Sequence, residues 1–265
     1  MQTVEEVTRM QNVLLGNTGR SVSRLAFGTA YMGPLSDRLS PEDGAALLLQ
    51  ALDRGIAFWD TSDDYGSHPH VAHALRQVPR EQVVIASKTY EPEGAVERIL
   101  AELGTDYLDI LFVHCVGLSW ADAARDCLRL WQQDKAQGRV RALGFSTHSA
   151  RVAWLAAEWP EVEVLLVPVN ASGICTPESG IEDGGVEEML EAAQRAWEVG
   201  KGVVAMKVLG CGALSVDAKA AISFAARLPY VHSLCIGMRN LGEIEDNVRL
   251  LSLVERQGNA IQESI

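Results

Sequence analysis

The feature that most constrains the fold of this chain is an eightfold alternation of short apolar runs with segments of helical periodicity. Runs this short and this apolar are typical of strands that are buried on both faces, as in a parallel sheet. Eight strand–helix units within 265 residues favour right-handed crossovers and closure into a barrel. The alternation therefore predicts an α/β fold, a (β/α)8 TIM barrel, with strands at residues 25–29, 56–59, 83–88, 109–114, 140–146, 164–170, 203–207 and 231–237.

Turn and capping residues add detail to this fold. Residues 12–24 hold an Asn-Thr-Gly turn between two strand-like runs, which predicts an N-terminal β-hairpin. Capping residues mark three helix starts, namely Ser40 before Pro41, Ser119 with Asp122, and Asn240 with Glu243. No linker or change of composition interrupts the chain, so we expect one domain over residues 1–265.

Charge and cysteine content argue against several classes of function. The formal net charge of −12 disfavours nucleic acid and anionic membranes as partners, because both are themselves negative. The polar start at residues 1–6 does not resemble a secretory signal, and no apolar run approaches the length of a membrane span. The five cysteines are odd in number and lack CxxC spacing, which indicates free thiols in a reducing cytoplasm. We therefore expect a cytoplasmic protein without nucleic-acid or membrane partners.

Polar residues gather at the carboxyl ends of the predicted strands. In such a barrel, the loops after the strands build the active site at one rim. Lys88 and Lys207 are unusual at these positions, since a lysine is rarely buried without a partner. The residues that close or directly follow the eight strands are Thr29, Asp60, Lys88, His114, Ser146, Asn170, Lys207 and Gly237.

Three of these residues, with Tyr65 in the loop after Asp60, form a chemically coherent set. A phenol has a reference pKa of about 10 and is a poor acid at neutral pH. The ammonium of Lys88 would stabilise the phenolate and lower that pKa, while Asp60 keeps the lysine charged and in place. His114 can hydrogen-bond a substrate oxygen and orient it. The set predicts a proton donor for an oxygen that becomes an alkoxide, as when hydride reaches a carbonyl.

Two further patterns leave alternatives open. His68, His70 and His73 could hold a metal, but no carboxylate or cysteine completes a ligand set nearby. We therefore expect no metal site, and histidines that line the substrate pocket instead. Lys207 or Lys88 could also act as the nucleophile of a Schiff-base aldolase, because a lysine that closes a barrel strand suits that mechanism. A carbon–carbon lyase is the rival enzyme class.

Several segments, in order along the chain, carry a resemblance to a known family. They are Leu15-Gly-Asn-Thr-Gly-Arg-Ser-Val-Ser-Arg-Leu25, Gly28-Thr29, Asp60-Thr-Ser-Asp-Asp-Tyr65-Gly66, Ala86-Ser-Lys88, Gly104-Thr-Asp-Tyr-Leu-Asp109, Gly138-Arg-Val-Arg-Ala-Leu-Gly144-Phe-Ser146, Ala205-Met-Lys-Val-Leu-Gly210 and Ile236-Gly-Met-Arg239. Each is weak alone, and together they are highly specific. From about Leu15 to Val254 the chain resembles the aldo-keto reductase superfamily, as a short member without the long C-terminal loop or an iron–sulfur tail.

The resemblance implies a reductase of aldehydes, ketones or sugars, or the reverse dehydrogenase, with a nicotinamide cofactor. The implied catalytic tetrad is Asp60, Tyr65, Lys88 and His114, with Tyr65 as proton donor. Arg239 and the start of the last helix suit a phosphate, so NADPH is expected, with NADH as the alternative. The residues implied to bind the cofactor are Thr29, Asp60, Ser146, Asn170, Met206, Lys207, Leu209, Gly210, Gly212, Gly237, Arg239, Asp246 and Asn247.

Several positions depart from the pattern of the resembled family, all where the nicotinamide would be held. Thr147 stands in place of an asparagine, Leu166 in place of a glutamine, Val169 in place of a tyrosine, and Met206 in place of a stacking aromatic. Fewer contacts to the nicotinamide are expected as a result. A cofactor-binding regulatory subunit with little turnover is therefore a third candidate function.

Overall fold

The computed structural model describes residues 10–34 and 36–262, so the polar start at residues 1–6 lies outside the described residues. Its core is a closed barrel of parallel strands in the order β10-β3-β4-β5-β6-β7-β8-β9. The predicted (β/α)8 TIM barrel is confirmed. The barrel strands are β3 (Leu25–Gly28), β4 (Phe58–Asp60), β5 (Val84–Thr89), β6 (Leu108–Val113), β7 (Val140–Ser146), β8 (Val164–Pro168), β9 (Gly202–Met206) and β10 (Ser233–Ile236).

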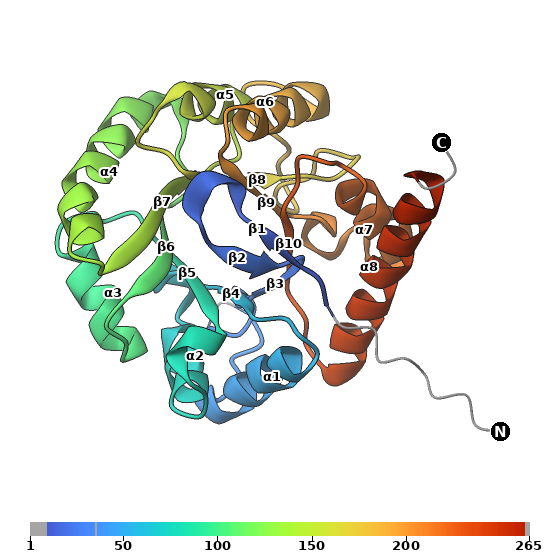
Figure 1. The fold of residues 1–265 in the computed structure, drawn as a ribbon, viewed down its shortest axis with the longest axis horizontal. Coiled ribbons are helices and arrows are strands. Elements are labelled where there is room, and N and C mark those ends of the chain that lie inside the picture. Colours follow the sequence, from blue (N-terminus) through green and yellow to red (C-terminus); the bar gives the residue numbers. More distant parts are fainter. Residues whose placement is uncertain (1–9, 35, 263–265) are drawn as a thin grey trace.

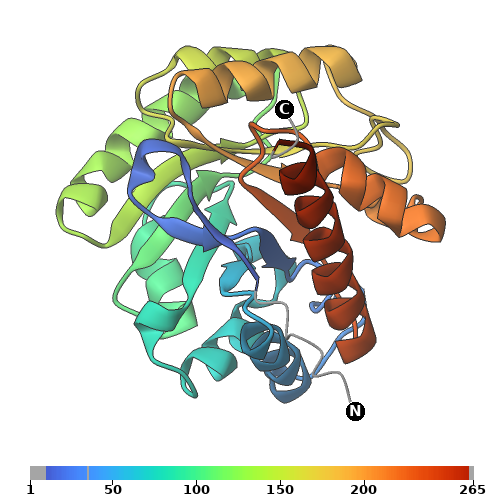
Figure 2. The ribbon, with the colours of Figure 1, turned by 45° about the vertical axis from the view of Figure 1, so that its right-hand side comes forward.

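Each barrel strand leads into one helix, and the helices form the outer layer of the molecule. They surround the strands as a ring in Figure 1, and Figure 2 shows α8 running along the outside of the barrel. Helix α8 packs against α7 and α1, which joins the end of the ring to its start. The helices are α1 (Pro41–Asp53), α2 (His68–Leu75), α3 (Ala95–Leu103), α4 (Ala121–Ala136), α5 (Ala150–Glu158), α6 (Val186–Glu198), α7 (Ala218–Ala226) and α8 (Leu241–Gln262).

Side chains alternate along the strands and divide the apolar core into two layers. Phe58 and Ile110 belong to the cluster that fills the barrel. Their chain neighbours Trp59 and Leu111 belong to the cluster between the strands and the helices. Because the barrel interior is packed with apolar side chains, polar chemistry is confined to the ends of the barrel.

The predicted hairpin is confirmed as β1 (Asn12–Leu14) paired antiparallel with β2 (Ser21–Ser23). Leu15 reaches the barrel interior, and its side chain fills the space beside Gly202, the first residue of β9. The hairpin therefore covers the amino-terminal end of the strands, and Figure 1 shows it lying across the ring. The carboxyl ends of the strands lie at the opposite end of the barrel.

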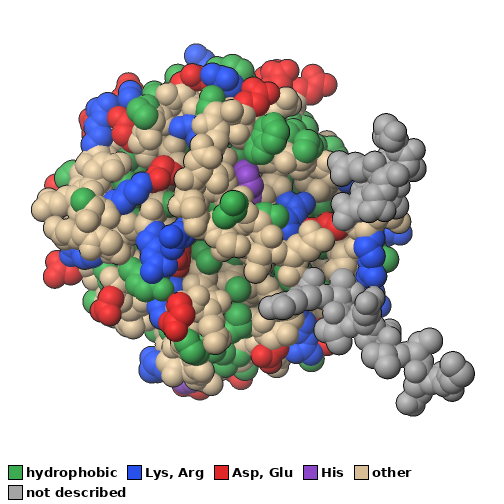
Figure 3. Space-filling model, viewed as in Figure 1, with side chains coloured by type: hydrophobic (Ala, Val, Ile, Leu, Met, Phe, Trp, Pro, Cys, Tyr) green, Lys and Arg blue, Asp and Glu red, His purple; other side chains and the backbone are tan. Residues whose placement is uncertain are grey.

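The hairpin end of the molecule carries charges of both signs. Figure 3, in the view of Figure 1, shows acidic and basic side chains close together around the hairpin. Beneath this surface lies the buried carboxylate of Asp109 in β6, which pairs with Arg80 at 2.8 Å and with Arg141 at 3.1 Å. No helix in the described part of the chain is both long and apolar enough to cross a bilayer.

The predicted caps of two helices are confirmed and that of a third is wrong. The Ser40 hydroxyl accepts from the backbone N–H of Asp43 at 3.1 Å, and Asn240 Oδ1 accepts from that of Glu243 at 3.0 Å. Ser119, however, lies inside a 3₁₀ turn, Leu118–Trp120, and α4 begins only at Ala121 without a side-chain cap.

Several predicted strands are also too long at their carboxyl ends. Thr29, His114, Asn170, Lys207 and Gly237 lie one or two residues beyond the last paired residue. Lys207 shows why, because its left-handed φ of 58° turns the backbone away from the sheet. These side chains belong to the loops at the rim, where a site can be built.

Candidate active site

The centre of the candidate site is a buried ion pair between neighbouring strands. Lys88 lies near the end of β5 and Asp60 ends β4, with 2.7 Å between Nζ and Oδ2. Nζ also donates to the carbonyl oxygen of Thr61 at 2.8 Å. Only 1% of the Lys88 side chain and 7% of the Asp60 side chain are exposed. Each charge therefore depends on the other, since an unpaired charge at such a position is strongly unfavourable.

Tyr65 lies beside this ion pair. It ends a 3₁₀ turn, Asp63–Tyr65, and the Nζ of Lys88 is 4.8 Å from the centre of its ring. The ring of His114 meets it edge-on, with 5.6 Å between ring centres. A Cβ at Gly33 would lie 1.7 Å from the carbonyl oxygen of Tyr65, so only glycine allows the two loops to approach this closely. The structure thus brings Asp60, Tyr65, Lys88 and His114 together at one end of the barrel.

The pKa of the Tyr65 phenol is raised well above its usual value, which contradicts the prediction that Lys88 lowers it. Burial is the main cause, and the negative charge of Asp60 adds to it. The ammonium of Lys88 is already bound to Asp60 and to a carbonyl oxygen, so its charge is largely balanced. A phenol in these surroundings is protonated at neutral pH and can act as a proton donor.

His114 follows β6 and contacts groups from two other loops. Its Nδ1 is 3.2 Å from Oδ1 of Asp64 and 3.2 Å from the Ser62 hydroxyl. The ring of Tyr90 lies 4.6 Å away at an angle of 31°. Burial disfavours a charge on the imidazole, but hydrogen bonds to Asp64 and to the Cys115 thiol outweigh it and raise the pKa of His114.

Thr29 and Ser146 are buried and hold the backbone around the ion pair. The Thr29 hydroxyl donates to the carbonyl oxygen of Asp60 at 3.0 Å and lies 2.8 Å from the hydroxyl of Ser67. The Ser146 hydroxyl accepts from the backbone N–H of Cys115 at 2.8 Å. Both side chains therefore have structural partners, and their contacts to a cofactor stay predictions.

The amide of Asn170 is fully used by backbone groups of its own loop and of the end of β9. Its Nδ2 donates to the carbonyl oxygens of Ile174 at 2.8 Å and Lys207 at 2.9 Å. Its Oδ1 accepts from the backbone N–H groups of Ser172 and Ile174, both at 3.1 Å. Asn170 thus ties the loop after β8 to the end of β9, and a bond to a nicotinamide would need one of these contacts to open.

The positions that depart from the family pattern, among them the buried Val169, offer little polarity to a ligand. The Thr147 hydroxyl donates to the carbonyl oxygen of Val116 at 2.6 Å. Leu166 is buried in the cluster that fills the barrel, and the half-buried Met206 packs against the same cluster. These side chains therefore leave no free polar group for the nicotinamide contacts expected from the resemblance.

The loop after β9 presents a cation and an open backbone. Lys207, Gly210, Cys211 and Gly212 have φ values of 58°, 53°, 53° and 97°. A Cβ at Gly212 would meet no atom within 4 Å, so a ligand could approach this backbone closely. Within residues 10–34 and 36–262, no carboxylate lies within ion-pair distance of Lys207. An unpaired ammonium beside an accessible glycine backbone fits a phosphate-bearing cofactor. The neighbouring Leu209 packs on the outer core.

The segment between β10 and α8 holds a cation that is already paired. The Nε of Arg239 is 3.1 Å from Oδ2 of Asp37, and 59% of the arginine side chain is exposed. Its backbone N–H donates to the carboxylate of Glu243 at 2.8 Å. A Cβ at Gly237 would come within 3.1 Å of the ring of Tyr31, so this segment also lies close to the loop after β3. Two carboxylates thus surround the residue predicted to bind a phosphate.

The last two predicted cofactor residues lie farther along α8. Asp246 is exposed and forms an ion pair with Arg249, one turn away. Asn247 is buried. Of these two side chains, Asp246 is therefore the one that a cofactor in solvent can reach in this structure.

A comparison of the sequence with protein families decides the family. The family model described as Aldo/keto reductase family matches residues 24–219, which include all barrel strands but the last. The chain belongs to this family. The resemblance expected from the motifs is thereby confirmed.

Individual members of the aldo/keto reductase family show how far the likeness extends. A probable aldo-keto reductase 1 from Glycine max is 34% identical over 131 residues, 42% of this chain and 38% of that protein. An L-galactose dehydrogenase from Arabidopsis thaliana is 29% identical over 157 residues, 53% of this chain and 49% of that protein. The chain thus matches less than half the length of each.

Among solved structures, an aldo-keto reductase from Bacillus halodurans in its holo form has the same fold. It superposes with a TM-score of 0.75 over 92% of this chain and 91% of that one, at 18% sequence identity. At this identity the likeness supports the barrel alone.

The three histidines of α2 do not converge in this family member, and the prediction that they line the pocket is wrong for His68. Its Nδ1 is 2.5 Å from the carboxylate of Glu102, and its Nε2 is 3.0 Å from the Ser87 hydroxyl. These partners lie in α3 and β5, so His68 is buried between the barrel and the helices. His70 bonds a backbone carbonyl oxygen, and His73 lies near an acidic side chain of α1. In the described residues, no group of three or more histidine, cysteine or acidic side chains is placed to hold a metal.

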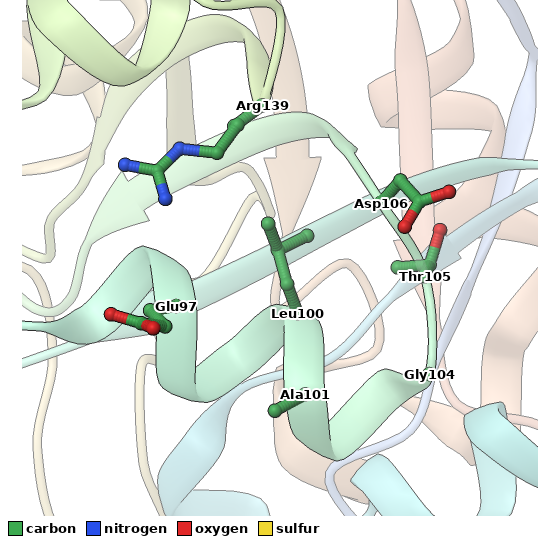
Figure 4. Close-up of a pocket in the computed structure, with 7 residues that line it drawn as sticks. All are labelled: Glu97, Leu100, Ala101, Gly104, Thr105, Asp106 and Arg139. Carbon is green, nitrogen blue, oxygen red and sulfur yellow. The ribbon is translucent and has the colours of Figure 1, made fainter.

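A groove of about 400 Å³ lies at the opposite end of the barrel from the tetrad. Figure 4 shows Leu100 rising from α3 toward Arg139, with Thr105 and Asp106 on the loop that leads into β6. Because this loop precedes its strand, the groove belongs to the amino-terminal end. It is therefore not the candidate active site.

The sequence analysis missed four side chains that face the tetrad. Asp64 precedes Tyr65 and lies within ion-pair distance of His114, while Tyr90 and Cys115 contact the same imidazole. Burial and the positive charges of Lys207 and His114 lower the pKa of the fourth side chain, His148, to about 4. Each of the four lies within two residues of a predicted site residue, a proximity that could have identified them.

Proposed function

We propose that this chain is a nicotinamide-dependent oxidoreductase that interconverts an alcohol and the carbonyl group of an aldehyde, ketone or sugar. Family membership supports an oxidoreductase of carbonyl compounds. The observation that carries the proposal is the Tyr65 phenol beside a buried, paired ammonium, with Lys88 Nζ 4.8 Å from its ring centre. A phenol placed there can give a proton to an oxygen at the mouth of the barrel.

The residues of the chain supply and control that proton. When bound, a reduced nicotinamide would supply the hydride that adds to the carbonyl carbon. Tyr65 transfers its O–H proton to the carbonyl oxygen as negative charge develops there, and Lys88 stabilises the phenolate that remains. His114 hydrogen-bonds the same oxygen and orients it. In the reverse direction the phenolate takes the proton from the alcohol.

We further propose that Lys207 and the backbone of Gly210 and Gly212 bind the pyrophosphate of the cofactor. The absence of a carboxylate partner for Lys207 among the described residues supports this role. Arg239 supports NADPH, because a guanidinium suits a 2′-phosphate. Its ion pair with Asp37 favours NADH as the second candidate, because a phosphate would have to displace that carboxylate. Titration with each cofactor, followed by tryptophan fluorescence, discriminates between them.

The decisive variant is Tyr65→Phe, which removes the proton donor and keeps the ring. We expect kcat for carbonyl reduction to fall about 10²- to 10⁴-fold, the usual contribution of a general acid, with nearly unchanged cofactor affinity. Tyr107→Phe is the matched control, since that ring stacks between Arg80 and Arg141 at the other end of the barrel. Wild-type kcat in Tyr65→Phe across a panel of carbonyl compounds would refute the assignment.

The alternatives give different outcomes in the same protein. A Schiff-base lyase would be trapped by borohydride with substrate at Lys207, because the Lys88 ammonium is bound to Asp60. A regulatory subunit would bind the cofactor and turn over none of the panel. A cytoplasmic location stays a prediction, supported by cysteines that form no disulfide among the described residues.

A further inference from the structure

His114 has a carboxylate partner that the catalytic tetrad does not include. Oδ1 of Asp64 lies 3.2 Å from Nδ1 of the imidazole, and the carboxylate also accepts from the hydroxyl of Ser62. That hydroxyl is fully buried and lies 3.1 Å from the carbonyl oxygen of Lys88 and 3.2 Å from Nδ1. Ser62 thus fixes the carboxylate and the imidazole relative to the end of β5.

The neighbouring carboxylate has a different partner. Asp63 pairs with Arg98 at 2.8 Å, on the side of the loop toward α3. Asp64 is 41% exposed at its side chain, whereas His114 is 6% exposed. The two adjacent aspartates of one turn therefore divide their roles, and only Asp64 faces the catalytic imidazole.

We propose that Asp64 is a positioning residue for the reaction, which holds a proton on Nδ1 of His114 so that Nε2 is the nitrogen that shares a proton with the substrate oxygen. A carboxylate can only accept a hydrogen bond, so a hydrogen bond between Nδ1 and Asp64, which are 3.2 Å apart, would place the proton on that nitrogen. The arrangement is that of an acid–histidine pair, in which the carboxylate selects the tautomer and stabilises the imidazolium. The role of Nε2 rests on the proposed function. The protonation state of Nδ1 does not depend on it.

Of the other ionisable groups around His114, some raise its pKa and others lower it. Burial and the positive charge of Lys88 disfavour an imidazolium, whereas His148, whose pKa is lowered to about 4, is neutral in the range where His114 titrates. The Cys115 thiol hydrogen-bonds the ring and favours it, while Tyr65 and Tyr90 contact the ring as neutral phenols whose pKa values are raised by burial.

With Asp64 added, the balance favours the imidazolium, and the pKa of His114 lies above its usual range. Asp64 is the one carboxylate within ion-pair distance of Nδ1 in the part of the chain that the structure describes. Its removal should therefore lower the pKa of His114.

The test is a titration of His114 by nitrogen-detected NMR in the free protein, with its signal assigned by its absence in His114→Gln. In Asp64→Asn we expect the midpoint to move to lower pH and the Nδ1 proton occupancy at high pH to fall. In Asp64→Glu, which keeps the charge, the midpoint should stay above that of Asp64→Asn. In Asp63→Asn it should stay at the wild-type value. An unchanged midpoint and tautomer in Asp64→Asn would overturn the proposal.

A kinetic measurement separates this inference from the proposed function. For carbonyl reduction we expect the alkaline fall of kcat/KM to move to lower pH in Asp64→Asn and to stay in place in Asp63→Asn. If the wild-type protein reduces no carbonyl, the proposed function fails while the NMR titration still decides the Asp64–His114 contact. If the protein reduces carbonyl compounds and Asp64→Asn leaves the pH profile unchanged, the positioning role is refuted and the proposed function stands.

Discussion

Two arcs of the rim differ in how their polar side chains are bonded. The arc that we propose to be catalytic, here called the catalytic arc, contains Asp60, Asp64, Tyr65, Lys88 and His114. It is bonded to itself through a buried ion pair and a carboxylate–imidazole contact. The arc that we propose to bind the cofactor, here called the cofactor arc, runs through the loops after β8, β9 and β10 and carries Asn170, residues 207–212 and Arg239. Its charges are half-buried or exposed and have fewer partners among the described residues.

The difference follows from where each charge lies. A buried ion needs a permanent partner, because water cannot replace that partner once the site is closed. A charge at the solvent can exchange partners at low cost, since its interactions are screened. The catalytic arc is therefore organised before a substrate arrives, whereas the cofactor arc keeps cations that a phosphate group can take over.

The largest effect is expected from Lys88→Met, which breaks the catalytic arc. The variant leaves the carboxylate of Asp60 buried without its cation, a change that typically costs about 3–5 kcal/mol of unfolding free energy. Loss of the ammonium also removes the stabilisation of the Tyr65 phenolate, so turnover should vanish as well. Urea unfolding and a carbonyl assay measure the two effects.

The double variant Asp60→Asn/Lys88→Met tells the two effects apart. With both charges removed, about half or more of the lost stability should return, because no unpaired buried ion remains. Turnover should stay absent. A double variant as unstable as Lys88→Met would mean that the ion pair is not the source of the cost.

A moderate effect is expected from Asn170→Ala in the cofactor arc. This side chain makes four hydrogen bonds that join the loop after β8 to the end of β9. Its removal should cost about 1–3 kcal/mol of unfolding free energy, because backbone groups inside the loop lose their partners. Asn12→Ala, at an exposed position of β1, is the control and should change the stability little. Equal stability in both variants would show that the hydrogen bonds of Asn170 contribute little to the stability of the protein.

The barrel could be predicted from the sequence because the signals for its strands and helices are periodic and act over short stretches of the chain. Apolar runs, caps such as Ser40 and Asn240, and the glycines after helices act within a few residues of the chain. The same reasoning placed Asp60, Lys88 and His114 at one rim, because parallel strands bring their carboxyl ends together.

The contacts that control the chemistry depend on distances across the fold and were not predictable in this way. The sequence suggested a lowered pKa for Tyr65 since Lys88 was near, but burial and the pairing of Lys88 with Asp60 reverse the direction. The resemblance assigned Asn170 to the cofactor, which stays a prediction, and nothing in the sequence indicated that this amide bonds to its own loop and to Lys207. Burial and competing partners decide such cases, and neither is encoded in spacing.

A smaller effect is expected from Asp37→Asn at the edge of the cofactor arc. The variant removes the carboxylate that occupies Arg239, so the affinity for NADPH should rise relative to that for NADH. Because the pair is exposed, its energy is about 0.2–1 kcal/mol, which corresponds to a change of roughly 1.5- to 5-fold in the ratio of dissociation constants. Asp53→Asn, at an exposed position in α1, controls for the change of net charge. An unchanged ratio would separate Arg239 from cofactor selection.

The smallest effect is the pH dependence of the stability that Asp64 supplies to the catalytic arc. Burial raises the pKa of Asp64, but hydrogen bonds to His114 and Ser62 outweigh burial and lower it. Burial lowers the pKa of His114, but hydrogen bonds to Asp64 and Cys115 outweigh burial and raise it. The Asp64 contribution is present above its unfolded pKa of about 3.9 and is lost as the pH falls through the folded value. The His114 contribution is present below about pH 6.5 and is lost as the pH rises through the folded value.

Both contributions therefore coincide between about pH 4 and pH 6.5. Asp64→Asn should destabilise the protein most in this window, by less than about 1 kcal/mol because the carboxylate is half exposed, and least near pH 9. Urea unfolding of the wild type, Asp64→Asn and Asp63→Asn at pH 5.5 and 9 measures the difference. A loss of equal size at both pH values would indicate that Asp64 acts on the loop through Ser62 and not through the charge of His114, and the catalytic arc would then hold only one pair of charges.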